Sequence, residues 1–309
     1  MLGLVTTMND KAPVELRELP EPRPQRDEAV LAVHALSINR GELRSVRNNG
    51  EGWVPGQDIA GIVLKQAEDG SGPPAGSRVV ALTDEFGWAQ RVAVPGHRMA
   101  VLPDNVGFAQ AATLPVAGLT ALRTLRHGTP LLGKRVLVTG AAGGVGTLAV
   151  QLAARSGARV TAVVGRQERA SGLKDLGARE VIEGIDNAQG RFGLILESAG
   201  GASLAQAIKL VEAKGTVVVY GNSSGEPTTL AFADFRGAPN SRVQSFSYFF
   251  SESEDRFAPD LGLLVSLIAD GSLKPQIGLE RSWRDFAAVA EQLRDRRVAG
   301  KAVLLVDAD

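Results

Sequence analysis

Residues 135–146, RVLVTGAAGGVG, decide how the central part of this chain folds. Arg135 to Thr139 is a short, mostly apolar run with the length of a buried strand. Four glycines follow within the next seven residues, and they permit a tight turn of the backbone. From Val145 onward, apolar residues recur at the spacing of one helical face. The stretch therefore predicts a strand, a glycine turn and a helix in direct succession.

This glycine turn has the features of a dinucleotide-binding loop. Glycines in such a turn, here including Gly143, let the backbone approach a pyrophosphate, whose charge is stabilised at the helix N-terminus. The spacing is G-x-x-G-x-x-G rather than G-x-G-x-x-G, and a plain turn is the alternative. A second strand, Arg159 to Val164, follows at the distance expected for a βαβ unit. Because all of these elements occur in order, we predict a dinucleotide site.

The residues after that second strand, Gly165-Arg166-Gln167-Glu168-Arg169, indicate which dinucleotide binds. An NAD site has a carboxylate at the strand end, where it accepts a hydrogen bond from the ribose 2′-hydroxyl. That carboxylate is missing, and two arginines are near. A guanidinium can form charge-assisted bonds to a 2′-phosphate. We therefore predict NADPH, bound chiefly by Arg166. In the alternatives, both arginines are solvated surface charges, or Glu168 pairs with one of them.

The pattern along the chain predicts two kinds of structure. Residues 1–117 consist of short β-like runs broken by Gly and Pro, which predicts a barrel-like, mostly antiparallel unit. In residues 118–272 strands alternate with helices, among them a helix through Leu173 and Leu176, and this predicts a parallel sheet covered on both faces. The expected strands after the glycine turn are Arg159–Val164, Glu180–Ile182, Leu194–Glu197, Thr216–Tyr220 and Val243–Tyr248.

Residues 273–309 form a third segment. A capping box at Ser282 predicts a helix with Phe286, Val289 and Leu293 on its inner face. The last strand, Lys301 to Val306, needs a partner, so we expect it to pair back into the first unit.

Composition excludes several classes of function. The chain has 309 residues, 34 Lys plus Arg and 34 Asp plus Glu, so its formal net charge is +0. This balance argues against a nucleic acid or an anionic membrane as the main partner. Cysteine is absent and only three histidines are present, which argues against thiolate metal sites and disulfides. The N-terminus shows no signal peptide, so we expect a cytoplasmic protein.

Several motifs, in the same order, resemble the medium-chain dehydrogenase/reductase superfamily and its zinc-free quinone oxidoreductase and enoyl reductase-like branch. The likeness covers nearly the whole chain. It is carried by the glycine turn together with Asn39-Arg-Gly-Glu42, Pro55-Gly-Gln-Asp58-Ile-Ala-Gly61, Gly76-Ser-Arg-Val79, Gly87-Trp-Ala-Gln90, Leu114-Pro-Val-Ala-Gly-Leu-Thr120-Ala, Gly221-Asn-Ser-Ser-Gly225 and Gly300-Lys-Ala-Val303.

The resemblance implies an α/β fold with two domains and a cofactor cleft between them. A GroES-like, partly open β-barrel catalytic domain would comprise residues 1–117 and 273–309. A Rossmann domain with a doubly wound parallel sheet would comprise residues 118–272. Zinc-dependent relatives have Cys at the position of Asn39 and a His-Glu pair at Gln57-Asp58. Because neither position here offers a thiolate or imidazole, we expect no metal.

The resemblance also implies roles for individual residues. The pyrophosphate would bind at Gly144, Val145 and Gly146, and the 2′-phosphate near Gly165 and Arg169. The nicotinamide half would lie near Asn39, Thr120 and Asn222, with its carboxamide held by the backbone of Phe246 to Tyr248.

No general acid is evident in the sequence. A tyrosine of the family, which can donate a proton in enoyl reductases, is replaced by Arg44, and the acid of the Asn-x-x-Asp element is Glu42. Arg44 and Tyr248 are the candidates, with a surface charge and a packing role as the respective alternatives. Trp53 and Trp88, beside glycine-rich turns, are candidates for a substrate pocket, with packing as the alternative.

These expectations combine into a zinc-independent NADPH-dependent reductase. The hydride acceptor would be a quinone or the C=C bond of an α,β-unsaturated carbonyl. One alternative is a biosynthetic enoyl reductase acting on a polyketide-like or carrier-linked intermediate. Another is a non-catalytic NADPH-binding structural or regulatory protein. From the resemblance we also expect a homodimer that joins Rossmann sheets edge to edge at Val243 to Tyr248.

Overall fold

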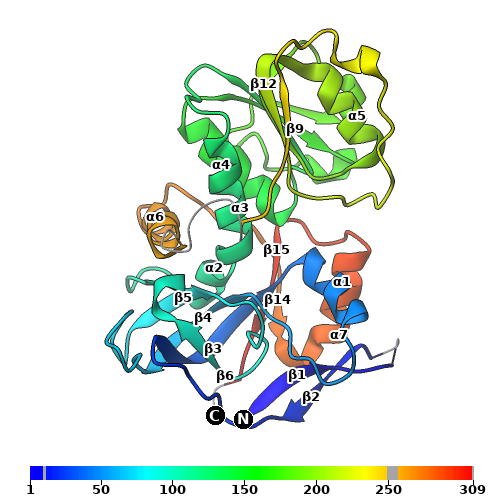
Figure 1. The fold of residues 1–309 in the computed structure, drawn as a ribbon. Helices are drawn as coiled ribbons and strands as arrows, with labels where there is room; N and C mark the ends of the chain where they lie inside the picture. Colours follow the sequence, from blue (N-terminus) through cyan, green and yellow to red (C-terminus); the bar gives the residue numbers. More distant parts are fainter. Residues whose placement is uncertain (10–11, 249–256, 308–309) are drawn as a thin grey trace. The chain divides into compact units, whose positions relative to one another are not determined.

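The computed structural model describes residues 1–9, 12–248 and 257–307 (Figure 1). The chain divides into two compact units. Unit 1 comprises Met1–Leu119 and Ser253–Asp309, and unit 2 comprises Thr120–Glu252. Within the described ranges, no helix has both the length and the apolar character needed to cross a membrane.

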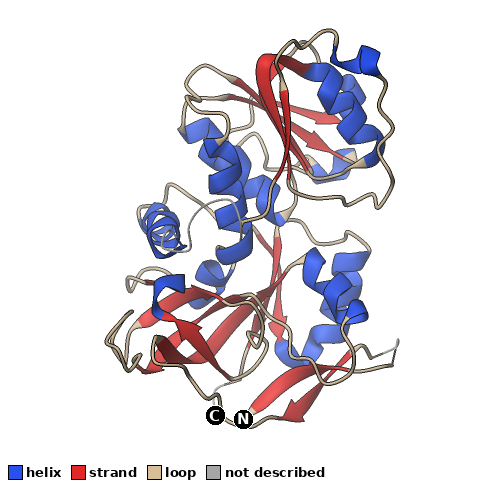
Figure 2. Cartoon of the chain, in the orientation of Figure 1, coloured by secondary structure: helices blue, strands red, loops and turns tan. Residues whose placement is uncertain are grey.

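Unit 1 is built on a seven-stranded sheet with the order β14-β15-β3-β4-β5-β7, in which β6 also pairs with β3. All of its neighbouring strands are antiparallel except β14 and β15. The predicted barrel-like, mostly antiparallel unit is therefore confirmed. Its strands, drawn in red in Figure 2, are β3 (Glu28–Ile38), β4 (Asp58–Lys65), β5 (Arg78–Leu82), β6 (Arg91–Pro95), β7 (Met99–Val101), β14 (Ile277–Ser282) and β15 (Lys301–Leu305), with a separate antiparallel hairpin of β1 (Leu2–Thr6) and β2 (Val14–Glu18).

The last strand pairs back into this unit, as predicted. Strand β15 is antiparallel to β3, with Leu304 opposite Leu36. Ser282 caps the following turn, since its Oγ accepts a hydrogen bond from the backbone N–H of Arg284 at 3.3 Å. The turn η6 (Trp283–Asp285) leads into α7 (Phe286–Arg294), whose residues Phe286, Val289, Ala290 and Leu293 are buried.

The other helices of unit 1 are α1 (Arg40–Asn48), α2 (Phe108–Ala112), α6 (Phe257–Ala269) and the short turn η1 (Gly96–Arg98), while α3 (Pro115–Arg126) runs from unit 1 into unit 2. Helix α6 packs on β7 and η1. It therefore belongs to unit 1, although the sequence placed residues up to 272 in the second domain. The domain boundaries predicted from the sequence, at 117/118 and 272/273, remain a prediction. The compact units of the structure divide at 119/120 and 252/253.

Unit 2 contains a six-stranded sheet with the order β10-β9-β8-β11-β12-β13, and all neighbouring strands are parallel. In chain order this is 3-2-1-4-5-6, the Rossmann order. Figure 1 shows α4 (Gly144–Arg155) and α5 (Gly201–Leu210) on opposite sides of the sheet. The predicted doubly wound sheet is confirmed. Its strands are β8 (Arg135–Thr139), β9 (Arg159–Val164), β10 (Glu180–Glu183), β11 (Phe192–Glu197), β12 (Val211–Val219) and β13 (Arg242–Ser245).

One helix predicted in unit 2 does not form. The turn η2 (Gln167–Arg169) follows β9, and residues 171–177 are turns rather than a helix through Leu173 and Leu176. Gly172 and Gly177 have φ angles of +76° and +105°. A helix cannot continue through the left-handed conformation at Gly172. Two further short turns, η3 (Ile185–Asn187) and η4 (Phe232–Phe235), complete the unit.

Candidate functional site

The glycine turn of unit 2 leaves backbone donors free at the start of α4. Gly143 is the N-cap, and a Cβ at Gly146 would lie 2.4 Å from the carbonyl oxygen of Gly140, so another side chain does not fit there. Within the described residues, the N–H groups of Gly144, Val145 and Gly146 have no backbone acceptor. They lie at the positive end of a 12-residue helix. This arrangement fits a pyrophosphate.

The end of β9 carries the two arginines that the sequence singled out. Gly165 and Arg166 are exposed, and the Arg166 guanidinium forms no ion pair within the part of the chain that the structure describes. Glu168 therefore does not neutralise Arg166. Arg169 is half-buried, and its Nη2 donates to the carbonyl oxygen of Ala142 at 3.3 Å. The two arginines thus differ, because Arg166 is open to a ligand while Arg169 contacts the glycine turn.

A fully buried carboxylate, which the sequence analysis missed, lies at the end of β11. Glu197 Oε1 accepts from Ser203 Oγ at 2.8 Å and from the Ala199 N–H at 3.0 Å, while Oε2 accepts from the Gly200 N–H at 2.9 Å. These bonds hold the turn before α5 at the same sheet edge as the glycine turn. The available signal was an acidic residue ending the apolar run FGLILE.

Tyr220 lies at this edge as well, and its role is structural. Its hydroxyl donates to the carbonyl oxygen of Thr139 at 3.3 Å. Burial raises the pKa of this phenol to about 12. The hydroxyl therefore stays protonated at neutral pH and bridges the ends of β12 and β8.

The remaining predicted cofactor residues of unit 2 differ in exposure. Asn222 is exposed, and its Oδ1 accepts from Ser224 Oγ at 3.2 Å. The Phe246 N–H donates to Val219 O at 2.8 Å, and the Tyr248 carbonyl oxygen accepts from Arg123 Nη1 at 3.0 Å. Thr120 is 5% exposed, within α3. Asn222 and Phe246 follow β12 and β13, so they share the carboxyl edge of the sheet with the glycine turn.

Unit 1 contains a buried carboxylate, Asp58, that binds four donors. Its Oδ2 accepts from Ser37 Oγ at 2.7 Å, from Asn39 Nδ2 at 2.8 Å and from Lys301 Nζ at 2.8 Å. Its Oδ1 accepts from the backbone N–H of Val116 at 2.7 Å. The side chain of Asp58 is 0% exposed, so these bonds replace the water that the carboxylate loses on folding.

Lys301 lies beside two positions where zinc-dependent relatives have metal ligands. Its side chain is 4% exposed, and Nζ also donates to Asn39 Oδ1 at 2.6 Å. The oxygens of Asn39 and Asp58 thus already bind a cation, and they offer neither thiolate nor imidazole. Over the described ranges, no three His, Asp or Glu side chains form a group that could hold a metal. The residues present do not fit a catalytic zinc.

Glu42 is a second buried acid of this cluster. Its Oε2 accepts from the Asn39 N–H at 2.7 Å and from Asn39 Nδ2 at 3.1 Å, and Oε1 accepts from the Gln57 N–H at 2.9 Å. Burial, followed by the charge of Asp58, raises the pKa of Glu42 to about 8, against the bonds from Asn39 and the charge of Lys301. At pH 7 the group is therefore mostly protonated.

Glu42 also lines a cavity of about 230 Å³ in unit 1, together with Trp53, Gln57 and Asp84. Trp53 Nε1 donates to Glu85 Oε2 at 2.9 Å, so the indole has a fixed orientation at the cavity.

Trp88, the second candidate for the substrate pocket, and Arg44, a candidate for catalysis, do not line this cavity. Trp88 is fully buried in the core, with its ring 4.8 Å from that of Phe286. Its place is that of a packing residue. Arg44 is exposed on α1 and is not among the described residues that line the cavity.

The fold and the glycine turn define the class of protein. A Rossmann sheet and a mostly antiparallel, GroES-like barrel in one chain are the two parts of a medium-chain dehydrogenase/reductase. A family model described as "Zinc-binding dehydrogenase" matches residues 144–264. The quinone oxidoreductase of Mus musculus is 30% identical over 306 residues, which cover 92% of this chain and 91% of that protein.

Solved structures show the same fold. The quinone oxidoreductase from Coxiella burnetii is 24% identical, with a TM-score of 0.85 and 99% of each chain covered. The Escherichia coli quinone oxidoreductase complexed with NADPH is 22% identical, with a TM-score of 0.88, and the match covers 99% of this chain and 100% of that one. The chain belongs to the quinone oxidoreductase-like branch of the medium-chain dehydrogenase/reductase superfamily.

The Lys301–Asp58 ion pair gives a prediction for stability. Lys301→Met leaves a buried carboxylate without its cation and should cost about 3–5 kcal/mol of unfolding free energy. In the double variant Lys301→Met/Asp58→Asn, the loss should be smaller than the sum of the single losses by about 1–3 kcal/mol. Denaturant unfolding measures all four proteins.

The exposed pair Arg26–Glu68, at 3.8 Å, is the matched control. The cycle with Arg26→Met and Glu68→Gln should give a coupling below about 1 kcal/mol. Equal couplings in the two cycles would contradict a special role for the buried pair.

Proposed function

We propose that this chain is an NADPH-dependent oxidoreductase that works without zinc and transfers a hydride to a quinone or to the C=C bond of an α,β-unsaturated carbonyl. The observation that carries the proposal is the glycine turn at the start of α4, with its free N–H groups and with the exposed Arg166 at the end of the next strand. The Escherichia coli quinone oxidoreductase, which has the same fold, was solved with NADPH.

Each end of the cofactor has a proposed set of binding residues. The pyrophosphate would be bound by Gly143, Gly144, Val145 and Gly146. The 2′-phosphate would be bound by Arg166 and Arg169, next to Gly165, which has no side chain. The nicotinamide half would be oriented by Asn39, Thr120, Asn222 and the backbone of Phe246 and Tyr248. When bound, NADPH supplies the hydride, and the chain's own residues orient it toward the acceptor.

Zinc independence is supported by the residues at the zinc position. The oxygens of Asn39 and Asp58 hydrogen-bond to the Lys301 ammonium at 2.6 and 2.8 Å. A second cation beside this ammonium would be repelled. Without a Lewis acid, suitable substrates are those whose own conjugation accepts the negative charge left by hydride transfer, and quinones and enones both do so.

A turnover screen tests the function directly. Quinones, simple enones and enoyl thioesters are offered with NADPH and with NADH, and oxidation of the nucleotide is followed by absorbance. We expect turnover with quinones or enones and a preference for NADPH. Turnover confined to enoyl thioesters would favour the biosynthetic enoyl reductase. Tight NADPH binding without turnover of any acceptor would favour a non-catalytic protein.

Arg166→Asp should change the choice of nucleotide. It removes one charge-assisted hydrogen bond to the 2′-phosphate, worth about 1.5–3 kcal/mol, so NADPH should bind about tenfold to a hundredfold more weakly. Affinity for NADH should rise, because the new carboxylate can accept from the ribose hydroxyl. Titration calorimetry measures both dissociation constants.

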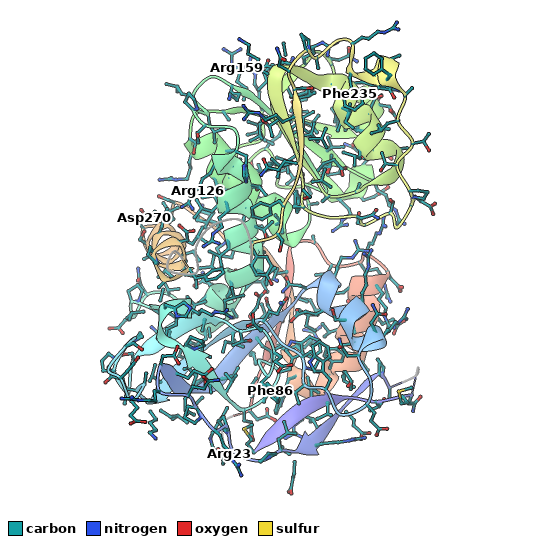
Figure 3. All side chains as sticks on the ribbon, in the orientation of Figure 1. Arg23, Phe86, Arg126, Arg159, Phe235 and Asp270 are labelled. Atoms are coloured by element: carbon teal, nitrogen blue, oxygen red, sulfur yellow. The ribbon has the colours of Figure 1, made fainter. Side chains whose placement is uncertain are left out.

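Arg159, at the opposite end of the same strand, gives the control (Figure 3). It is exposed, and Arg159→Asp makes the same change of charge. If Arg166→Asp weakens NADPH binding no more than Arg159→Asp does, the phosphate site is misplaced.

For the quaternary structure, we propose a homodimer through the edge of the unit 2 sheet. Strand β13 is the last strand in the order, all of its residues are exposed, and Val243 is 45% exposed. Further exposed apolar side chains, Leu230, Phe232 and Phe235, come from the segment just before β13. An exposed edge strand with apolar neighbours favours pairing with a second copy.

Val243→Asp should weaken such a dimer. Each copy would place a carboxylate at the shared sheet edge, where the two negative charges would repel each other and lose their water. Light scattering at micromolar concentration should show a dimeric wild type and a larger monomer fraction for the variant. Val101→Asp, at the last strand of the unit 1 sheet, is the control, since the Val101 side chain is 55% exposed although the rest of β7 is buried. A monomeric wild type would overturn the dimer.

A further inference from the structure

We propose that Glu42 is the general acid of the reaction and donates the proton that the substrate's α-carbon receives after hydride transfer. This proposal rests on the proposed function, and it assigns a residue to the step for which the sequence identified no donor.

Glu42 lines the cavity of about 230 Å³ with Trp53 and Gln57. The residue is only 4% exposed, so the carboxyl group is shielded from bulk water while it borders this cavity, in which we place the acceptor. Arg44 and Tyr248, the earlier candidates, are not among the described residues lining that cavity.

Three N–H donors point at the Glu42 carboxyl oxygens: the backbone N–H and Nδ2 of Asn39, and the backbone N–H of Gln57. They fix the side chain, and they also stabilise the carboxylate that remains once the proton has left. A carboxyl group held in this way is preorganised to lose a proton and regain it.

Asp58, on β4, and Lys301, on β15, form a buried ion pair at 2.8 Å, and both charges act on Glu42, that of Asp58 more strongly. Asp84, the other acid lining the cavity, is paired with Arg98 at 2.8 Å. Burial, followed by the negative charge of Asp58, favours the protonated form of Glu42 and raises its pKa to about 8, against the bonds from Asn39 and the charge of Lys301.

The step balances as follows. The β-carbon of an enone accepts a hydride from the reduced nucleotide, which is oxidised, and the C=C electrons move to the carbonyl oxygen as an enolate. The α-carbon then forms a bond to the proton of Glu42 while the O–H bond breaks, and the ketone is regenerated. Glu42, now a carboxylate, takes a new proton from water before the next turnover.

Quinones do not need this donor. Reduction of a quinone puts its protons on oxygen, and hydroquinone oxygens take protons from water directly. A comparison of enone turnover with quinone turnover in the same variant therefore distinguishes a role of Glu42 as the proton donor from a purely structural role of Glu42. Loss of the helix-capping contacts of Glu42 would lower both activities, whereas loss of the proton would lower only enone reduction.

The test is Glu42→Gln, with kcat measured for one enone and one quinone. We expect enone kcat to fall about a hundredfold or more, with quinone kcat changed far less. In the wild type, enone kcat should fall as the pH rises through about 8, because the acid form is required. This limb should be absent from the quinone profile and from the Glu42→Gln enone profile, and Glu42→Asp should partly restore enone turnover.

Asp234→Asn is the control, since Asp234 accepts the backbone N–H of Ala231 in the capping box of η4 but lies far along the chain in unit 2. It should leave the ratio of enone to quinone kcat unchanged. An equal loss on both substrates in Glu42→Gln would overturn the proposal.

Two further outcomes are distinguishable. If Glu42→Gln does not fold, wild-type pH profiles that are identical for enone and quinone would overturn the proposal by themselves. If the wild type turns over neither substrate, the proposed function fails first.

Discussion

The buried Asp58 carboxylate, with its bond to Lys301, connects parts of unit 1 that are far apart in the sequence. The two residues are 243 positions apart, at the start of β4 and the start of β15. The same carboxylate binds Ser37 of β3 and the backbone at Val116 in α3. Neither charge is stable at this depth without the other. The C-terminal strand can therefore dock only where its lysine reaches this carboxylate, and that requirement reinforces the register of β15 on β3.

Much of the fold could be predicted from local patterns. The run from Arg135 into the glycine turn combines a strand-length apolar segment with a helical period, and the structure has β8 and α4 there. The pairing of the last strand, β15, was predictable because its apolar residues can be buried only when the strand pairs with another strand. The expected helix through Leu173 fails because apolar spacing alone ignores Gly172, whose positive φ interrupts the backbone. The spacing of apolar residues indicates which side chains prefer burial. It does not determine the backbone conformation, so one residue with a positive φ can prevent the helix that the spacing predicts.

The buried polar groups could not be predicted in the same way. Glu42, Asp58 and Lys301 stand in recognised motifs, but charged residues in a motif are compatible with a solvated surface. Their burial depends on partners far away in sequence, and no local window contains them. One signal was available: Lys301 opens the apolar run AVLLV of an inner strand, and a lysine there needs a buried carboxylate. Glu197, at the end of β11, has the same pattern in unit 2.

The ammonium at the zinc position also limits the chemistry of the site. A catalytic zinc keeps an open coordination position for the substrate oxygen, whereas Lys301 already uses two N–H donors on Asn39 and Asp58. It compensates the charge of Asp58 and leaves little capacity to polarise a carbonyl. Under the proposed function, an isolated alcohol or ketone would therefore gain little from this site. An acceptor that delocalises its own negative charge needs an oriented hydride and a proton, and in unit 1 the protonated Glu42 beside the cavity is suited to provide that proton.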